Sequence, residues 1–249
     1  MSDLAPKRPH HRAVDRIAAI LETVATEPQG LGLTQLALRL DAPVSSIQKL
    51  VNGLVAVGYL DETDHRFTLG AAPYLLSLRA GRVPARVVRH ADLVALSREH
   101  RCSAVLAVRL GDASVYVDWA GTDDPFNYLT VRQLRTPLPE TAVGRVLLAH
   151  LPERERHEVV SAHVGGEAEA ALGLLAELAE IREDGFSLGD SGPMLRGIAA
   201  VAAPVWAEGV VVGAVSLAGR REGVGERLPE LAEVLVSAVR EWAGRAVER

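Results

Sequence analysis

The sequence has a single cysteine, few aromatic residues and no long apolar run, and each lack excludes a class of protein. Because Cys102 is the only cysteine in 249 residues, the chain cannot form an internal disulfide or a cysteine-rich zinc site. No apolar stretch approaches the roughly 20 residues that cross a bilayer. Segment 1–12 is polar and basic, unlike a secretory signal. We therefore expect a cytoplasmic protein.

Aromatic residues make up 4% of the chain, whereas hydrophobic residues make up 48% and charged residues 24%. These values are ordinary for a soluble globular protein, so aliphatic side chains must fill its core. The length suggests one large domain or two smaller ones. A formal net charge of −5 argues against a uniformly basic surface, but a local patch can still bind DNA.

Three helices and two short strands are predicted in the N-terminal part, from apolar residues spaced three and four apart. Pro28 and Gly30 end the first helix. The Thr34 hydroxyl is expected to cap the second, and Pro43 lies near the start of the third. The helices cover residues 13–25, 35–40 and 44–57, and the strands cover 59–60 and 66–69 across a polar turn at 61–65. This order is typical of a winged helix-turn-helix.

The third helix separates an apolar face from a polar face. The apolar face consists of Val44, Ile47, Leu50, Val51 and Leu54, and the polar face of Ser45, Gln48, Lys49 and Asn52, with Ser46 in the first turn. No acidic residue lies between Ala42 and Leu60. A helix in the major groove needs such donors and no carboxylate that would repel the DNA backbone. The alternative is a solvated face on a core helix.

The charge of this region limits what one copy can do. Residues 1–70 carry seven Lys and Arg against eight Asp and Glu, so a single module should bind DNA weakly. High affinity would need a dimer that reads two half-sites. Residues 1–12 are interpreted as a flexible basic arm, which either contacts DNA or is a solvated tail.

Residues 71–85 are predicted to form a linker helix ended by Gly81 and Pro84, and a larger mixed region follows. Its predicted helices cover 87–99, 141–150, 153–162, 170–184 and 226–247. Its predicted strands cover 104–109, 114–119, 128–131, 198–206 and 210–217, with a turn at Glu208-Gly209. The expected fold class is α/β (α+β).

In both regions the chain resembles transcription factors of the IclR (isocitrate lyase regulator) type. The resemblance is carried in order by Gly32-Leu33-Thr34-Gln35-Leu36-Ala37, Gly58-Tyr59-Leu60, Arg66-Phe67-Thr68-Leu69-Gly70, Pro139 to Arg145, Ala199 to Val205 and Gly213-Ala214-Val215-Ser216. It implies a winged helix-turn-helix (13–70), a linker helix (71–85) and a GAF-like effector-binding and oligomerisation domain (86–249). It also implies homodimers or dimers of dimers that bind operator DNA.

The resemblance implies DNA contacts from the recognition helix and the wing. With the neighbouring polar residues, the predicted DNA-binding set is Thr34, Gln35, Ser45, Ser46, Gln48, Lys49, Asn52 and Arg66. Gly53 departs from the larger residue usual in the family. Because glycine inside a helix costs about 1 kcal/mol relative to alanine, we interpret Gly53 as a mark of close helix packing.

The resemblance also implies an effector pocket at the start of the 141–150 helix, where a helix N-terminus and small residues can receive a carboxylate. The predicted effector-binding set is Thr141, Ala142, Val143, Gly144, Asp190, Ala200, Ser216 and Ala218. Ala200 and Ala218 replace the family's usual Cys and Ser and make the pocket less polar. An organic acid and a more apolar or bulkier ligand both stay open. Trp119, Tyr128 and Trp206 could line a pocket, but we expect each to pack in the core.

Enzymatic alternatives find little support in the residues. Gly189-Asp190-Ser191-Gly192-Pro193 resembles a protease nucleophile motif with one glycine missing, and we interpret it as part of a polar turn between Phe186 and Ile198. The histidines show no metal-ligand spacing, Gly165-Gly166 is not followed by the Lys-Ser/Thr of a phosphate loop, and Cys102 is interpreted as a packing residue. We expect no catalytic residue, cofactor or metal.

The sequence thus predicts a DNA-binding transcriptional regulator controlled by a small-molecule effector, such as an organic acid or related metabolite. The effector would change the relative placement of two DNA-binding modules through the linker helix. The alternative is a small-molecule-binding or catalytic GAF-like protein with a vestigial helix-turn-helix.

Overall fold

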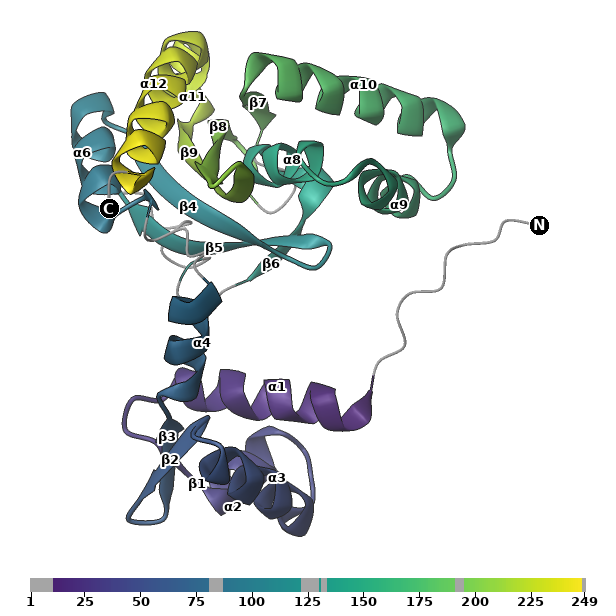
Figure 1. The fold of residues 1–249 in the computed structure, drawn as a ribbon. Helices are drawn as coiled ribbons and strands as arrows, with labels where there is room; N and C mark the ends of the chain where they lie inside the picture. Colours follow the sequence, from purple (N-terminus) through teal and green to yellow (C-terminus); the bar gives the residue numbers. More distant parts are fainter. Residues whose placement is uncertain (1–10, 81–86, 122–129, 131–133, 191–194, 248–249) are drawn as a thin grey trace. The chain divides into compact units, whose positions relative to one another are not determined.

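The computed structural model describes residues 11–80, 87–121, 130, 134–190 and 195–247. The chain divides into two compact units, residues 1–81 and 82–249 (Figure 1). Within the described residues, no helix is both long enough and apolar enough to span a membrane.

The first unit combines four helices with a small antiparallel sheet of order β1-β3-β2. Its elements are α1 (Arg12–Ala25), β1 (Leu31–Gly32), α2 (Leu33–Arg39), α3 (Val44–Ala56), β2 (Leu60–Thr63), β3 (Arg66–Leu69) and α4 (Ala72–Ala80). Ile20, Leu36, Ile47 and Leu60 are fully buried and come from four different elements. The helices are therefore stabilised by a shared apolar core, which short helices need.

Two details of this unit differ from the sequence prediction. Thr34 is not a cap: α2 begins at Leu33, and the Gln35 side chain accepts a hydrogen bond from the Gly32 amide at 2.9 Å. The predicted turn at 61–65 is shorter, because β2 continues to Thr63. Asp64 and His65 alone make the turn, both at positive φ (51° and 58°), which matches the right-handed twist of a two-residue hairpin.

Two residues of α3 also lie differently from expectation. Val44, assigned to the apolar face, is 43% exposed. It is the first residue of α3 and precedes the part of the helix that packs into the core. Gly53 was interpreted as a close packing position, and this is wrong. It is exposed, and a Cβ added there would meet no atom within 4 Å.

The second unit is built on a six-stranded antiparallel sheet of order β6-β5-β4-β9-β8-β7. Its strands are β4 (Ser103–Leu110), β5 (Ala113–Ala120), β6 (Arg135–Pro137), β7 (Ser187–Asp190), β8 (Ile198–Ala207) and β9 (Val210–Arg220). Its main helices are α6 (His90–His100), α8 (Ala142–Ala149), α9 (Glu153–His163), α10 (Ala168–Asp184) and α12 (Leu228–Val247). The β8–β9 turn uses Glu208 and Gly209, both at positive φ, as predicted.

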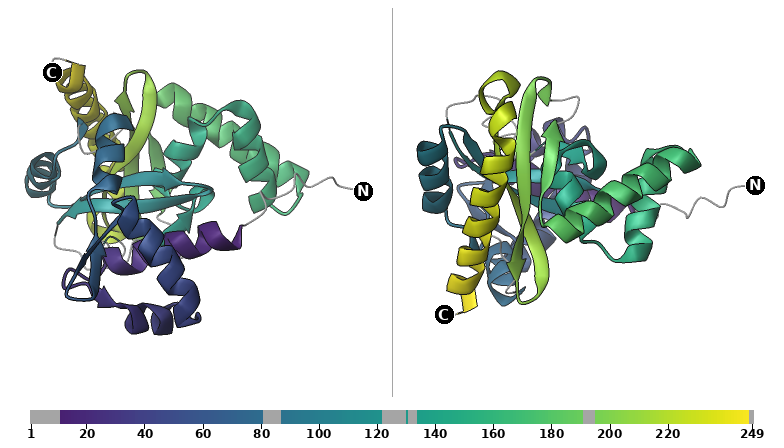
Figure 2. Two further views of the ribbon diagram at one scale, coloured as in Figure 1. Left: turned by 60° about the horizontal axis from the view of Figure 1, so that its bottom comes forward. Right: turned by 90° about the horizontal axis from the view of Figure 1, so that it is seen from above.

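Helices cover both faces of this sheet (Figure 2). Alternate residues of β8 belong to two separate cores, with Ala199, Val201 and Ala203 in one and Ala200 and Ala202 in the other. The first core includes residues of α6 and α12, and the second includes residues of α8 and α10. Burial on both faces explains why β8 reads as a continuous apolar run. Cys102 is buried in the first core.

Several predicted boundaries in this unit were wrong. The helix expected from residue 87 begins as α6 at His90, and the last helix begins at Leu228, after a short helix at Arg221–Val224 and a 3-10 turn. The strand expected at 128–131 lies outside the described residues except for Thr130, which is helical. The expected polar turn between 186 and 198 contains β7, an edge strand that pairs with β8. Gly189 and Asp190 suggest a turn, so the strand is apparent only from its ladder with β8.

Candidate nucleic-acid interface and effector site

The polar face of α3 is exposed as the helical spacing predicts. Ile47 and Val51 are fully buried, which turns the opposite side of the helix to solvent. Ser45, Gln48, Lys49 and Asn52 are all exposed on that side. The surface of α3 therefore presents amide, hydroxyl and ammonium groups without a carboxylate.

A groove of about 390 Å³ lies between α2, α3 and the β2–β3 hairpin. Four of the predicted DNA-binding residues line it: Thr34, Gln35, Gln48 and Asn52. Two come from α2 and two from α3, so the fold brings together residues that are 13 or more positions apart in the chain. The structure thus joins these polar side chains on one surface beside the wing.

The hairpin adds an acidic residue and a histidine to this groove, neither of which the sequence of α3 reveals. Glu62 of β2 and His65 of the turn both line the groove, and His65 Nδ1 lies 3.6 Å from Glu62 Oε1. An acid therefore faces the groove even though α3 itself carries none. Its position on a separate strand, at an exposed hairpin, left no helical pattern in the sequence that would reveal it.

Arg16 is a second residue that the sequence did not single out. Its Nη1 donates a hydrogen bond of 3.0 Å from α1 to the Ser46 hydroxyl in the first turn of α3. A half-buried guanidinium is therefore fixed beside the start of the polar face. The two residues are 30 positions apart, and only the packing of α1 against α3 reveals their contact.

Arg66, the predicted wing contact, is engaged within the unit. Its Nε donates to the Gln29 carbonyl at 2.8 Å, and its Nη2 donates to the Gly30 carbonyl at 2.6 Å. These bonds hold β3 against the segment that follows α1. The side chain remains exposed, but its guanidinium already donates hydrogen bonds within the unit.

In the second unit, the start of α8 is built around a buried hydroxyl. Thr141 Oγ1 accepts a hydrogen bond from the Gly144 amide at 3.0 Å and caps the helix. Gly144 has no room for a side chain, because a Cβ there would overlap the Leu138 carbonyl. Thr141, Ala142, Val143 and Gly144 are all buried, so the helix start is pressed into the protein interior.

Tyr116 of β5 completes this buried group. Its hydroxyl hydrogen-bonds the Thr141 side chain, and burial raises the pKa of the phenol to about 12. Tyr116 therefore stays protonated at neutral pH. The sequence missed this residue because Tyr116 and Thr141 meet only when β5 is placed in the sheet.

The remaining predicted effector residues lie on the sheet face that α8 covers. Ala200 pairs with Ala218 across β8 and β9, and both belong to the same core cluster as Ala142 and Val143. Ser216 pairs with Ala202 of that cluster and is 3% exposed. The fold thus gathers small residues from two strands, β8 and β9, under α8.

Strand β7 borders this small-residue surface. The backbone of Gly189 pairs with Ala200, whereas Asp190 pairs with Ala199, so Asp190 is one register position beyond Ala200. A Cβ at Gly189 would lie 3.5 Å from a guanidinium nitrogen of Arg145, which also binds Glu177 at 2.6 Å.

Ser187 of β7 is a further polar residue that the sequence did not suggest. It pairs with Ala202, whose other strand partner is Ser216, so three small residues form a row across three strands. Ser187 is 1% exposed, and its hydroxyl has no hydrogen-bond partner within the part of the chain that the structure describes. A buried hydroxyl without a partner is unfavourable by about 1–3 kcal/mol.

Comparisons with known proteins agree with both units. The family model of the IclR helix-turn-helix domain matches residues 13–64, and that of the bacterial transcriptional regulator IclR C-terminal domain matches residues 81–246. The chain is 29% identical over 209 residues to SauR of Cupriavidus necator, a probable transcriptional regulator, covering 78% of this chain and 79% of SauR. It is 26% identical over 221 residues to the HTH-type transcriptional regulator XynR of Escherichia coli, covering 83% and 85%.

Solved structures show the same fold. An IclR homologue of Microbacterium hydrocarbonoxydans, complexed with 4-hydroxybenzoate, superposes with a TM-score of 0.68 at 21% identity, covering 94% of this chain and 99% of the homologue. The IclR of Thermotoga maritima superposes with a TM-score of 0.60 at 21% identity, covering 95% and 99%. With two family models that together match most of its length, the chain belongs to the IclR family of bacterial transcriptional regulators.

Proposed function

We propose that this regulator reads operator DNA with the exposed polar face of α3 and the adjoining groove, and that a small organic acid in the second unit controls this binding. The observation that carries the first part is the acid-free face of α3 together with the groove lined by Gln48 and Asn52. Amide side chains suit base edges in the major groove. The family match and this exposed face do not favour a vestigial helix-turn-helix.

Within this interface, each residue type has its own role. Gln48 and Asn52 would contact base edges, whereas Lys49, Ser45 and Ser46 would contact phosphates. Thr34 and Gln35 would contact the DNA strand that enters the groove. Arg66 would act mainly by holding the wing, because its donors already bind two backbone carbonyls.

The protein would bind DNA as a homodimer or as a dimer of dimers. One first unit is about neutral in charge, so two copies are needed for strong binding. Helix α4 supports this proposal, because Tyr74, Leu75, Leu76 and Leu78 are between 39% and 66% exposed. Exposed apolar patches of this kind mark interaction sites.

The effector would lie between the start of α8 and the sheet, against Thr141, Ala142, Val143, Gly144, Ala200, Ser216, Ala218 and the strand that ends at Asp190. Ser187 supports a polar ligand there, because a ligand atom would provide the partner that its buried hydroxyl lacks among the described residues. A helix N-terminus favours a carboxylate. The 4-hydroxybenzoate bound to the structural relative belongs to this chemical class.

The regulator would act in the cytoplasm, by binding rather than by catalysis. Its operator is sought in the DNA upstream of its own gene by gel shift with the full chain. Operator affinity is then titrated with and without organic acids that raise the melting temperature, since a ligand that binds the folded state stabilises it. Retarded bands that no such acid changes would remove the effector coupling, and no retardation at any protein concentration would overturn DNA binding.

A further inference from the structure

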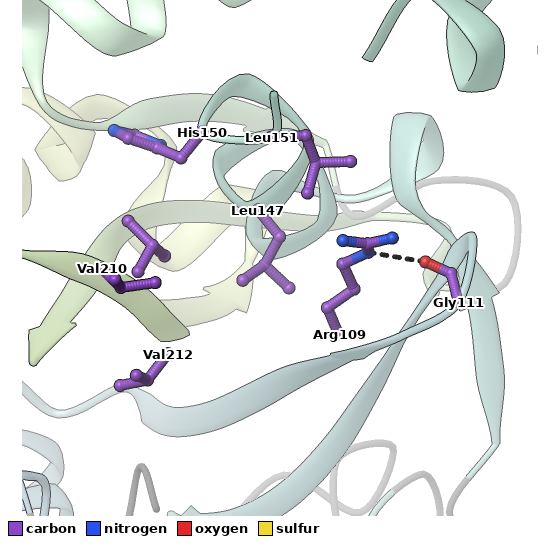
Figure 3. A pocket seen from close by; sticks show the side chains of 8 residues that line it. Arg109, Gly111, Leu147, His150, Leu151, Val210 and Val212 are labelled. Carbon is purple, nitrogen blue, oxygen red and sulfur yellow. Dashed lines mark hydrogen bonds between the residues drawn. The ribbon is translucent and has the colours of Figure 1, made fainter. Parts of the chain in front are cut away.

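A second pocket lies at the opposite end of α8 from the proposed effector site. It has a volume of about 300 Å³ and is formed by the last turn of α8, the β4–β5 hairpin and the first residues of β9 (Figure 3). Its lining residues are Arg109, Gly111, Leu147, His150, Leu151, Val210, Val211 and Val212. None of them belongs to the predicted effector set. Helix α8 has eight residues and is therefore roughly 12 Å long, and the two sites lie at its opposite ends.

Five of the eight residues that line this pocket are aliphatic. Leu147 projects into the space between Arg109 and Val212, and Leu151 and Val210 lie further along the walls (Figure 3). Val210 is 43% exposed, so apolar surface remains in contact with water there. Pockets that combine aliphatic side chains with a few polar groups are typical of small-molecule sites.

A guanidinium lies at one side of the pocket. Arg109 Nε donates to the Gly111 carbonyl at 2.7 Å, which fixes the orientation of the side chain (Figure 3). Its terminal nitrogens bind the carboxylate of Glu155 on α9. The Glu155 side chain is 41% exposed, so this ion pair is partly open to solvent. The pair shows that Arg109 is placed to bind a carboxylate, and a ligand could supply one instead.

His150 lies along the upper side of the pocket and reports its electrostatics. Its Nδ1 is 2.9 Å from the Val146 carbonyl, and its ring meets Trp206 edge-on at 5.2 Å. Trp206 is 39% exposed, so it does not lie in the core as expected. Burial lowers the pKa of His150, and the charges of Arg182 and Arg156 lower it further. The charges of Arg182 and Arg156 therefore act on this side of the pocket, although the bond to the Val146 carbonyl opposes their effect on the pKa of His150.

From this geometry we infer that the pocket at the end of α8 is a second ligand site, which binds a short aliphatic carboxylic acid. The carboxylate of the ligand binds Arg109 in place of Glu155, and the aliphatic tail of the ligand lies along Leu147 and Val210. Charge-assisted hydrogen bonds to the guanidinium orient the ligand, and the aliphatic side chains select for an apolar tail. The inference does not depend on DNA binding or on the site at the start of α8.

The test uses hexanoate and the uncharged hexan-1-ol with the full chain. Binding is measured by calorimetry and by the NMR signals of the His150 ring, which is local to the pocket. Arg109→Gln is expected to weaken hexanoate binding about tenfold or more, because the charged partner is lost. Glu155→Gln is expected to strengthen it about threefold or more, because the competing carboxylate is removed.

Matched control variants come from α9, the helix that carries Glu155. Arg154 and Glu158 form an exposed pair at 3.0 Å on α9, and Arg154→Gln and Glu158→Gln remove the same charges away from the pocket. Both should leave hexanoate affinity within about twofold. Val210→Asp, at an exposed position, should abolish binding without unfolding the chain, as a thermal melt verifies.

Two outcomes would overturn the inference. One is hexan-1-ol binding as tightly as hexanoate, which would exclude recognition by Arg109. The other is hexanoate binding, or a shift of the His150 signals, that persists unchanged in both Arg109→Gln and Val210→Asp. Either result would leave the proposed DNA interface and effector site untouched.

Discussion

Arg66 in the wing is bonded to the backbone of Gly30, with 2.6 Å between its Nη2 and the Gly30 carbonyl oxygen. Gly30 has a φ of +69°, and a Cβ there would lie 3.0 Å from the Phe67 carbonyl. The chain therefore makes a close approach to β3 that only glycine allows. The hydrogen bond from Arg66 stabilises this close approach between segments 36 positions apart in the chain.

Replacing Arg66 with alanine is expected to lower the free energy of unfolding by about 1–3 kcal/mol, because two carbonyl groups lose a charged donor. Arg66→Lys should recover only part of this, since lysine cannot reproduce the two-nitrogen geometry. Thermal unfolding of the full chain measures both. If stability is unchanged while the salt dependence of DNA binding falls by about one charge, Arg66 is a phosphate contact, as the sequence predicts.

Replacing Lys49 with alanine is expected to weaken operator binding and to reduce the slope of log affinity against log salt by about one. Lys49 is exposed, so the melting temperature should stay the same. Arg240→Ala removes one positive charge from an exposed position of α12 in the other unit and serves as the control. Equal effects of the two substitutions would show that α3 has no special role.

Replacing Gly53 with alanine is expected to raise the free energy of unfolding by about 1 kcal/mol. Gly53 is helical and exposed, and the added methyl group meets nothing within 4 Å. Gly173 of α10 has the same properties, so Gly173→Ala should stabilise similarly. If chemical denaturation shows that Gly53→Ala loses stability and Gly173→Ala does not, the result would support the close packing at Gly53 that the sequence suggested.

Asp92 is expected to make stability depend on pH in the acidic range. Burial alone would raise the pKa of this carboxyl, but hydrogen bonds from Arg89 and Arg245 outweigh it and lower the pKa below 3.8. Because the folded pKa is the lower one, this stabilisation is complete above the unfolded pKa and is lost as pH falls through the folded value.

The substitution Asp92→Asn tests this expectation. It should lower the free energy of unfolding by about 1–3 kcal/mol at pH 7, because Asp92 Oδ1 lies 3.1 Å from Arg245 and joins α6 to α12. The difference between the two proteins should shrink as the pH falls below about 4. A difference that is the same at pH 7 and pH 3 would show that the charge of Asp92 contributes nothing.

The helices of the winged module and the β8–β9 hairpin were readable from the sequence because their signals are local. Apolar spacing places Ile47 and Val51 on one side of α3, and a glycine after Glu208 allows a tight turn. The same locality explains the errors. Strand β7 contains Gly189 and Asp190, which suggest a turn, and only its ladder with β8 makes it a strand.

The sequence by itself determined the family, through motifs in order along the chain. It also determined the order of the three helices and the wing hairpin in the first unit and the polar face of α3, since these follow from residues close together. Only the tertiary structure decided that Arg66 binds Gly30, that Glu62 faces the groove, that Tyr116 meets Thr141 and that Gly53 is open to solvent. These outcomes depend on how separate segments pack. Periodicity along one segment tells which side is buried, but it does not tell what the side chain contacts there.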